Sequence, residues 1–311
     1  MSLDRLIEKI EQTQNPSVAG LDPKLAYVPE FIKEKCFEKY GETLKGAAKA
    51  LLEFNKGLID ALYDIVPAVK PQAAYYEMYG PAGVKTLYKT QEYVRSKGMY
   101  VITDGKRNDI GTTMEAYAAA HLGKVQVGSQ TYEPFLGDAL TVNGYLGSDG
   151  IKPLVATCRD NDKGIFVLVK TSNPSSGELQ DKKIDGVTIY ETMGHMCEEW
   201  GKELPGVYGY SGVGAVVGAT YPEQLKYLRE KLPTTFFLIP GYGAQGAGAK
   251  DIAGAFDKNG LGGIVNSSRG IMCAYQKEKC DEHEFAEAAR REAIRMRDEI
   301  MGIVGKISIS K

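Results

Sequence analysis

Cysteine and histidine are scarce in this sequence, and the few present do not form the patterns of a structural metal site. The 311 residues include five cysteines, an odd number with no Cys-x-x-Cys pair. This favours reduced thiols over a disulfide framework and argues against structural zinc. The three histidines, His121, His195 and His283, lie far apart without metal-ligand spacing, so we expect them to be surface or packing residues.

The sequence also lacks a strong charge bias and long apolar runs. The formal net charge is -2, so no overall basic field is available to hold nucleic acid or an anionic membrane surface. The N-terminus is charged from Asp4 and Arg5 onward, without the apolar segment of a signal peptide, and no apolar run approaches membrane-spanning length. We therefore expect a soluble, cytoplasmic protein that binds neither nucleic acid nor membrane.

What the sequence does contain is a regular alternation of short apolar runs with longer amphipathic segments. Hydrophobic residues make up 43% of the chain, enough for a large core. The apolar runs predict eight strands, at residues 17–23, 68–74, 99–103, 139–143, 164–170, 212–218, 234–239 and 262–265. Helices are predicted at 42–63, 83–97, 114–120, 187–202, 222–232 and 283–301, and a further one ends near residue 156.

Eight strands, each followed by a helical segment, predict an α/β fold: a single (β/α)8 TIM barrel with its ligand site at the C-terminal ends of the strands. No linker interrupts the pattern, so residues 1–311 are predicted to form one domain. An open doubly wound sheet would alternate in the same way. No Gly-x-Gly-x-x-Gly follows the first strand, which disfavours that alternative. The polar segment 24–40 is interpreted as an insertion before the first long helix.

Four charged side chains lie within six positions directly after the third predicted strand: Asp104, Lys106, Arg107 and Asp109. A structural salt bridge is the simplest interpretation of an isolated Asp-x-Lys pair. However, Asp104 and Lys106 are two residues apart and project to the same side of an extended segment, in a strand expected to be apolar on both faces. Because such a pair is costly to hold unless it is used, we interpret it as functional.

Polar residues also follow the other predicted strands, and in a barrel these positions meet at one mouth. They are Asp22, Lys70, Asn143, Ser172, Gly241 to Gly246, Ser267 and Arg269. The glycine-rich loop after the seventh strand offers backbone N–H groups, and Arg269 offers a bidentate cation, a combination that commonly holds phosphate in barrels. Alone the glycines would indicate a tight turn, but beside Arg269 they favour an organic phosphate ligand.

The motif Asp104-x-Lys106-x-x-Asp109-Ile110, followed by Thr113, closely resembles the active-site motif of the orotidine 5'-phosphate decarboxylase family. Other residues fall in the order that this family uses: Lys70, Ser172, Pro240, Gly241, Gln245 and Arg269. The similarity spans Asp22 to Arg269, and the length of the chain resembles the longer bacterial branch. Two positions depart from the family pattern, Gly111, where many members have proline, and Tyr242, where many have a small aliphatic residue.

This resemblance implies decarboxylation of orotidine 5'-phosphate to uridine 5'-phosphate and CO2, the last step of de novo UMP biosynthesis, without metal or cofactor. Loss of CO2 from C6 leaves a carbanion in an orbital orthogonal to the ring π system, so stabilisation must be electrostatic. By resemblance, Lys106 stabilises this carbanion and then protonates it, while Asp104 lies against the departing carboxylate. Lys70 and Asp109 would complete an array of alternating charges around Lys106.

The resemblance implies binding roles as well. These are Asp22 and Lys70 for the ribose hydroxyls, Ser172 for the pyrimidine amide, Gln245 and Arg269 for the phosphate, and Pro240 and Gly241 in the same loop. In this family the residues at Asp109, Ile110 and Thr113 reach into the partner's site, which implies a homodimer.

Two alternatives stay open from the sequence. The first is a magnesium-dependent sugar-phosphate lyase or aldolase on the same barrel, in which the acidic residues would ligate the metal. Lys70 disfavours this reading because an extra cation beside the acids opposes metal binding. The second is a non-catalytic nucleotide-binding barrel, which the complete set of four charged residues disfavours.

Overall fold

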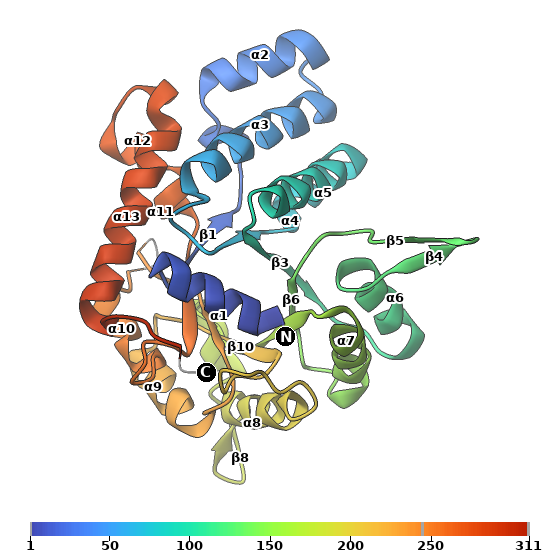
Figure 1. Cartoon of the computed structure of the whole chain (residues 1–311), viewed down its shortest axis with the longest axis vertical. Helices are drawn as coiled ribbons and strands as arrows, with labels where there is room; N and C mark the ends of the chain where they lie inside the picture. The colour runs from blue at the N-terminus through green and yellow to red at the C-terminus, as the bar shows by residue number, and fades with distance from the viewer. Residues whose placement is uncertain (1, 244–245, 310–311) are drawn as a thin grey trace.

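The computed structural model describes residues 2–243 and 246–309, and its centre is a closed barrel of eight parallel strands (Figure 1). Around the barrel the strands follow the order β1-β12-β11-β10-β7-β6-β3-β2, and β2 pairs with β1 to close the barrel. Their bounds are β1 Ser17–Leu21, β2 Ala68–Pro71, β3 Tyr100–Arg107, β6 Ala139–Val142, β7 Gly164–Lys170, β10 Val213–Val217, β11 Phe237–Ile239 and β12 Gly263–Ser267. The predicted (β/α)8 barrel is thereby confirmed, and each of its strands overlaps a predicted apolar run.

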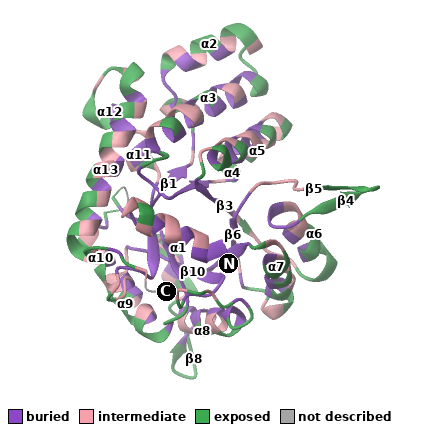
Figure 2. Cartoon of the chain, in the orientation of Figure 1, coloured by how far each residue is buried: buried purple, intermediate pink, exposed green. Residues whose placement is uncertain are grey.

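Most strand residues are buried and apolar, as expected for a sheet covered on both faces, although polar side chains such as Lys70, Asp104 and Thr141 are buried among them (Figure 2). Helices surround the barrel: α3 Leu44–Leu62, α5 Gly80–Ser96, α6 Gly111–His121, α7 Ser148–Asn161, α8 Ile189–Gly201, α9 Pro222–Lys231 and α13 Phe285–Val304. Shorter helices are α2 Glu30–Tyr40, α4 Ala74–Glu77, α10 Ala249–Ile252, α11 Arg269–Met272 and α12 Ala274–Glu278, with single 3-10 turns at Leu25–Tyr27, Pro174–Glu178, Ala253–Ala255 and Glu282–Glu284. Among the described residues, no helix combines the length and the apolarity that crossing a bilayer requires.

A helix that the sequence analysis did not predict covers the N-terminal ends of the strands. This helix, α1, comprises Ser2–Thr13, and its buried face packs into the same apolar cluster as the barrel interior. The Ser2 hydroxyl hydrogen-bonds the Tyr100 hydroxyl at the start of β3, with 2.6 Å between the oxygens. The floor of the barrel is therefore closed, and its open mouth lies at the C-terminal ends of the strands.

Three segments correct the sequence interpretation. Segment 24–40 is not merely polar, because it forms a 3-10 turn and α2, and its residues Val28, Ile32 and Cys36 are buried. The helix predicted from residue 187 begins at Ile189, since Val187–Thr188 forms β9 of a short hairpin with β8, Lys183–Ile184. A second hairpin, β4 Val125–Val127 with β5 Gln130–Tyr132, extends away from the barrel beside α6 (Figure 1).

Candidate active site

A cavity of about 730 Å³ opens at the C-terminal ends of the barrel strands. Every one of the eight strands, or the loop that follows it, contributes to its wall. Most of the residues singled out from the sequence line this cavity: Asp22, Lys70, Asp104, Lys106, Ser172, Pro240, Gly241 and Arg269. The fold thus gathers side chains from distant parts of the sequence into one chamber.

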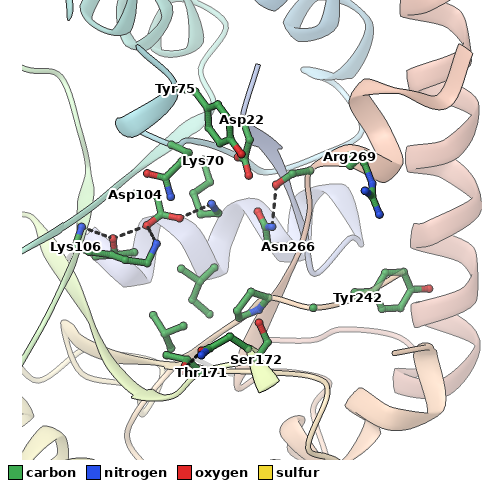
Figure 3. Close-up of a pocket in the computed structure, with 18 of the residues that line it drawn as sticks. Asp22, Lys70, Tyr75, Asp104, Lys106, Thr171, Ser172, Tyr242, Asn266 and Arg269 are labelled. Carbon is green, nitrogen blue, oxygen red and sulfur yellow. Dashed lines mark hydrogen bonds and ion pairs between the residues drawn. The ribbon is translucent and has the colours of Figure 1, made fainter. Parts of the chain in front are cut away.

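Three of these side chains form a continuous charged array on one side of the cavity (Figure 3). The Lys70 ammonium lies 2.7 Å from one oxygen of the Asp104 carboxylate, and the Lys106 ammonium lies 2.6 Å from the other. Lys70 and Asp104 are buried, whereas the Lys106 side chain is 47% exposed to the cavity. The Thr141 hydroxyl on β6 also donates to Asp104, at 2.8 Å. The carboxylate is held from three sides, and Lys106 is the member open to a ligand.

An irregularity in β3 places Lys106 in this array. The pairing of β3 with β6 shifts register between Thr103 and Arg107, and Lys106 has a backbone φ of 47°. Its N–H donates to Thr141, with 3.0 Å between the atoms. Residues other than glycine rarely adopt this left-handed backbone conformation, because it costs them about 1–3 kcal/mol of conformational free energy. The spacing of Asp104 and Lys106 suggested a regular strand, but the two meet through this local distortion.

The array also sets the charge of its buried members. Burial alone would raise the pKa of the Asp104 carboxyl, but Lys70 and Lys106 hold this pKa well below its ordinary value. Burial likewise opposes the charged form of Lys70, yet Asp104 and Asp22 raise the pKa of its ammonium above the usual range. Asp104 is therefore a carboxylate, and Lys70 an ammonium, throughout the neutral pH range.

The lining of the cavity is apolar on some strands and polar on others. Leu168, Val216 and Leu238 contribute apolar surface from β7, β10 and β11. Asp22, directly after β1, lies across the chamber from Ser172 (Figure 3). One carboxylate oxygen of Asp22 is buried and has no hydrogen-bond partner among the described residues. An acceptor of this kind is unusual in a folded protein and is suited to a hydroxyl donor from a ligand.

The loop after β7 forms a second wall. The Ser172 carbonyl accepts a hydrogen bond from the Thr220 hydroxyl, with 3.1 Å between the oxygens. Gly218 lies against Ser172 so closely that a Cβ at this glycine would stand 2.8 Å from the Ser172 Cα and Cβ. No hydrogen bond is recorded for the Ser172 hydroxyl within the described ranges, so it is available to a ligand.

At the far end of the cavity from Lys106, Arg269 projects from the start of α11 (Figure 3). The loop after β11 lies beside it, and Gly241 in that loop has a φ of 100°, which favours glycine. Tyr242 anchors the loop, because its hydroxyl donates to Glu299 of α13 at 2.7 Å. Gln245, which the sequence analysis placed in the phosphate grip, lies outside the described residues.

Three predicted site residues do not reach the cavity of their own chain. Asp109, Ile110 and Thr113 lie at the start of α6, and none of them lines the chamber. The Asp109 carboxylate accepts a hydrogen bond from the Ile110 N–H, and the Ile110 side chain is 50% exposed. Asn143 is also absent from the lining, since its side chain accepts from the Tyr145 N–H. Within one chain the array therefore has three members, and Asp109, the fourth charge, is the one that the resemblance assigns to the partner's site.

Sequence reasoning missed several lining residues. They are Lys24, Tyr27, Gln72, Tyr75, Thr141, Thr171, Asn173, Gln180, Asn266, Ser268 and Met272. Thr141 lies within the predicted strand 139–143, two residues before its end, and Asn266 directly follows the predicted strand 262–265. Considering the inward-facing positions at and just before the C-terminal end of each strand would have identified both. Lys24 and Tyr27 belong to the segment that carried no recognised pattern.

The described part of the chain contains no group of three His, Cys, Asp or Glu side chains arranged to hold a metal ion. Each carboxylate oxygen of Asp104 has an ammonium group as its partner, Lys70 on one and Lys106 on the other. The expectation of chemistry without metal or cofactor stays a prediction, to be tested below.

Comparison with known proteins identifies the family. The profile of the Orotidine 5'-phosphate decarboxylase / HUMPS family matches residues 42–281. Orotidine 5'-phosphate decarboxylase of Rhodopirellula baltica is 44% identical over 297 residues, covering 94% of this chain and 96% of that protein. The protein of that name from Clostridium perfringens is 42% identical over 301 residues, covering 96% of this chain and 98% of the relative.

Solved structures agree. The structure of Leishmania donovani OMP decarboxylase superimposes with a TM-score of 0.72 at 30% identity, covering 95% of this chain and 98% of that one. The fold, the cavity and the matches over most of the sequence lead to one conclusion: the chain belongs to the orotidine 5'-phosphate decarboxylase / HUMPS family of enzymes.

Proposed function

We propose that this chain decarboxylates orotidine 5'-phosphate to uridine 5'-phosphate and CO2, the last step of de novo UMP biosynthesis, without metal or cofactor. The observation that carries the proposal is the Lys70–Asp104–Lys106 array at the cavity wall. It presents one partly exposed ammonium, backed by a carboxylate that stays ionised. Names of relatives at more than 40% identity support the same reaction.

The chemistry requires a cation at C6 of the pyrimidine. As the C6–CO2 bond breaks, its electron pair stays on C6, and the Lys106 ammonium stabilises this charge and then transfers a proton to it. Asp104 repels the substrate carboxylate in the ground state, and this repulsion disappears as neutral CO2 leaves. Lys70 keeps Asp104 ionised and oriented, with 2.7 Å between the two groups. The array thus acts as a preorganised field.

The cavity offers a matching order of contacts for the nucleotide. With C6 at Lys106, the ribose lies towards Asp22 and Lys70, and the 5'-phosphate lies at Arg269 and the Gly241 loop, at the opposite end of the chamber (Figure 3). Ser172 faces the pyrimidine amide from the β7 loop. Gln245 is proposed to join the phosphate contact. Binding energy gained at the phosphate is distant from C6, yet it can position the ring there.

We further propose a homodimer in which Asp109, Ile110 and Thr113 of one protomer complete the cavity of the other. Ile110 and Thr113 are exposed and Asp109 is half-buried at the start of α6, outside their own cavity, which supports this arrangement. Asp109 would then supply the fourth charge beside Lys106 across the interface.

The direct test follows the ultraviolet absorbance of orotidine 5'-phosphate incubated with the purified protein in excess EDTA. We expect the wild type to form uridine 5'-phosphate, and Lys106→Ala to lose activity by at least about 10⁴-fold, because one group serves as both electrostatic stabiliser and proton donor. Lys152→Ala, an exposed lysine on α7, is the matched control and should retain full activity.

The other outcomes identify the alternatives. A wild type that is inert in EDTA but acts on sugar phosphates with magnesium would be a lyase or aldolase on this barrel. The protein would be a non-catalytic nucleotide-binding barrel if the wild type and Lys106→Ala bound uridine 5'-phosphate equally well and the wild type turned over neither orotidine 5'-phosphate in EDTA nor sugar phosphates with magnesium.

A further inference from the structure

A buried lysine that the proposed chemistry does not use lies at the end of β7. The Lys170 side chain is fully buried, with 0% of its surface exposed, and it does not line the cavity. Its ammonium lies 2.7 Å from the Asp181 carboxylate and donates to the Ser176 hydroxyl at 3.1 Å. The Tyr221 ring covers it, with 4.3 Å from the nitrogen to the ring centre. A buried ammonium is costly without such partners, so this position has a strong structural requirement.

The partners of Lys170 all belong to the loop after β7 or to the residues that support it. This loop, residues 171–181, contains the 3-10 turn Pro174–Glu178, and its last residue, Asp181, pairs with Lys170 at the end of β7. Lys170 therefore ties the start of the loop to its middle at Ser176 and to its end at Asp181. Tyr221 adds a second connection, since its hydroxyl donates to the Asn173 carbonyl at 3.3 Å.

The same loop presents four cavity-lining residues: Thr171, Ser172, Asn173 and Gln180. Two of them are locked together, because the Gln180 amide accepts from the Thr171 N–H at 2.9 Å and donates to the Thr171 hydroxyl at 2.7 Å. Gln180 is adjacent to Asp181, the anion that Lys170 holds. Displacing Asp181 would therefore move Gln180, and with it the Thr171–Ser172 wall.

We propose that Lys170 is a positioning residue for pyrimidine recognition: through Asp181 and Ser176 it fixes the 171–181 loop so that Ser172 and Gln180 face the base. It touches no substrate itself. This inference rests on the proposed function, because it assigns the base-recognising wall of that same cavity. Arg269 and Asp22 follow other strands, β12 and β1, so we expect the phosphate and ribose ends of the cavity to be independent of Lys170.

The test compares a ligand that has the base with one that lacks it. Dissociation constants of uridine 5'-phosphate and of ribose 5-phosphate are measured by equilibrium titration for the wild type, Lys170→Met, Asp181→Asn and the Lys170→Met/Asp181→Asn double variant. We expect Lys170→Met to weaken uridine 5'-phosphate by about tenfold or more, equivalent to about 1.4 kcal/mol, and to leave ribose 5-phosphate within about twofold. Asp181→Asn should shift the same ligand in the same direction, and the double variant should resemble Lys170→Met.

Lys202→Met is the matched control, since Lys202 forms an exposed ion pair with Glu199 on α8. It should leave both constants unchanged. Equal weakening of both ligands by Lys170→Met would show a general structural role and overturn the proposal, as would wild-type constants for both. Turnover of orotidine 5'-phosphate by the wild type is measured separately, so a wrong reaction is distinguished from a wrong role for Lys170.

Discussion

Among single residues, Lys106 illustrates which features of the site can be predicted from the sequence and which cannot. The spacing in Asp104-x-Lys106 was sufficient to predict that the two charges belong together. It did not predict the φ of 47° or the register shift against β6, because both depend on Thr141, which is distant in sequence. Strained backbone at a functional position is held only by its surroundings, so local pattern cannot reveal it.

We expect the buried residue His121 to make the free energy of unfolding depend on pH. It is buried at the end of α6, stacked on Phe135, and burial together with the nearby Arg107 lowers its pKa to about 4. The native state therefore keeps His121 neutral, whereas the unfolded chain takes up a proton below about pH 6.5. Because the unfolded state binds more protons, stability falls as pH decreases from about 6.5 to about 4, by about 3 kcal/mol in total.

Urea unfolding at several pH values between 7 and 4 measures this effect. His121→Gln should lose less stability than the wild type over the same interval, by about 3 kcal/mol. His195→Gln, at an exposed position of α8, is the control and should follow the wild type. Parallel curves for His121→Gln and wild type would mean that His121 is protonated in the folded protein.

At the scale of elements, buried segments were predicted well and exposed ones poorly. Each barrel strand coincides with an apolar run, since burial on both faces leaves a continuous signal. The hairpin β4–β5 was missed because its two strands are exposed on both faces and have only three residues each, too few for an alternation to be recognised. In contrast, the sequence of α1 contains a signal that predicts a helix: apolar residues at helical spacing, Leu3, Leu6, Ile7 and Ile10. This helix could have been predicted from the sequence but was missed.

The floor helix α1 should affect stability without affecting chemistry. Leu6 is fully buried in the cluster that joins α1 to the barrel interior. Leu6→Ala should lower the free energy of unfolding by about 2–5 kcal/mol, through lost burial and the cavity left behind. Because the helix covers the end of the barrel opposite the cavity, kcat at 25 °C should stay at the wild-type value. Urea unfolding and steady-state assays on one preparation measure both, and a large fall in kcat would show that floor and mouth are coupled.

At the scale of the whole molecule, the proposed shared sites predict complementation between inactive variants. Lys106→Ala and Asp109→Ala should each be nearly inactive alone. After subunit exchange, half of the dimers contain one of each chain, and one of the two cavities in such a dimer has both wild-type residues. Mixing equal amounts should then restore about one quarter of the wild-type activity.

The negative control for this experiment is a mixture of Lys106→Ala with Asp104→Asn. These two residues line the same cavity from one chain, so no exchanged dimer regains a complete site and activity should not return. Failure of the first mixture to regain activity, with exchange verified by mass, would place Asp109 outside the partner's cavity.

The closure of the barrel has a consequence for the order in which this protein can mature. β1 and β12 come from opposite ends of the sequence and pair at Val18 and Asn266. Asp22, the proposed ribose contact, follows one of these strands, and Arg269, the proposed phosphate contact, follows the other. Joining such distant segments is the slow, entropically costly event in folding a barrel. A chain that has not yet made this seam can form its charged array but does not bring the proposed ribose and phosphate contacts together, so we expect full nucleotide binding only when the last strand is in place.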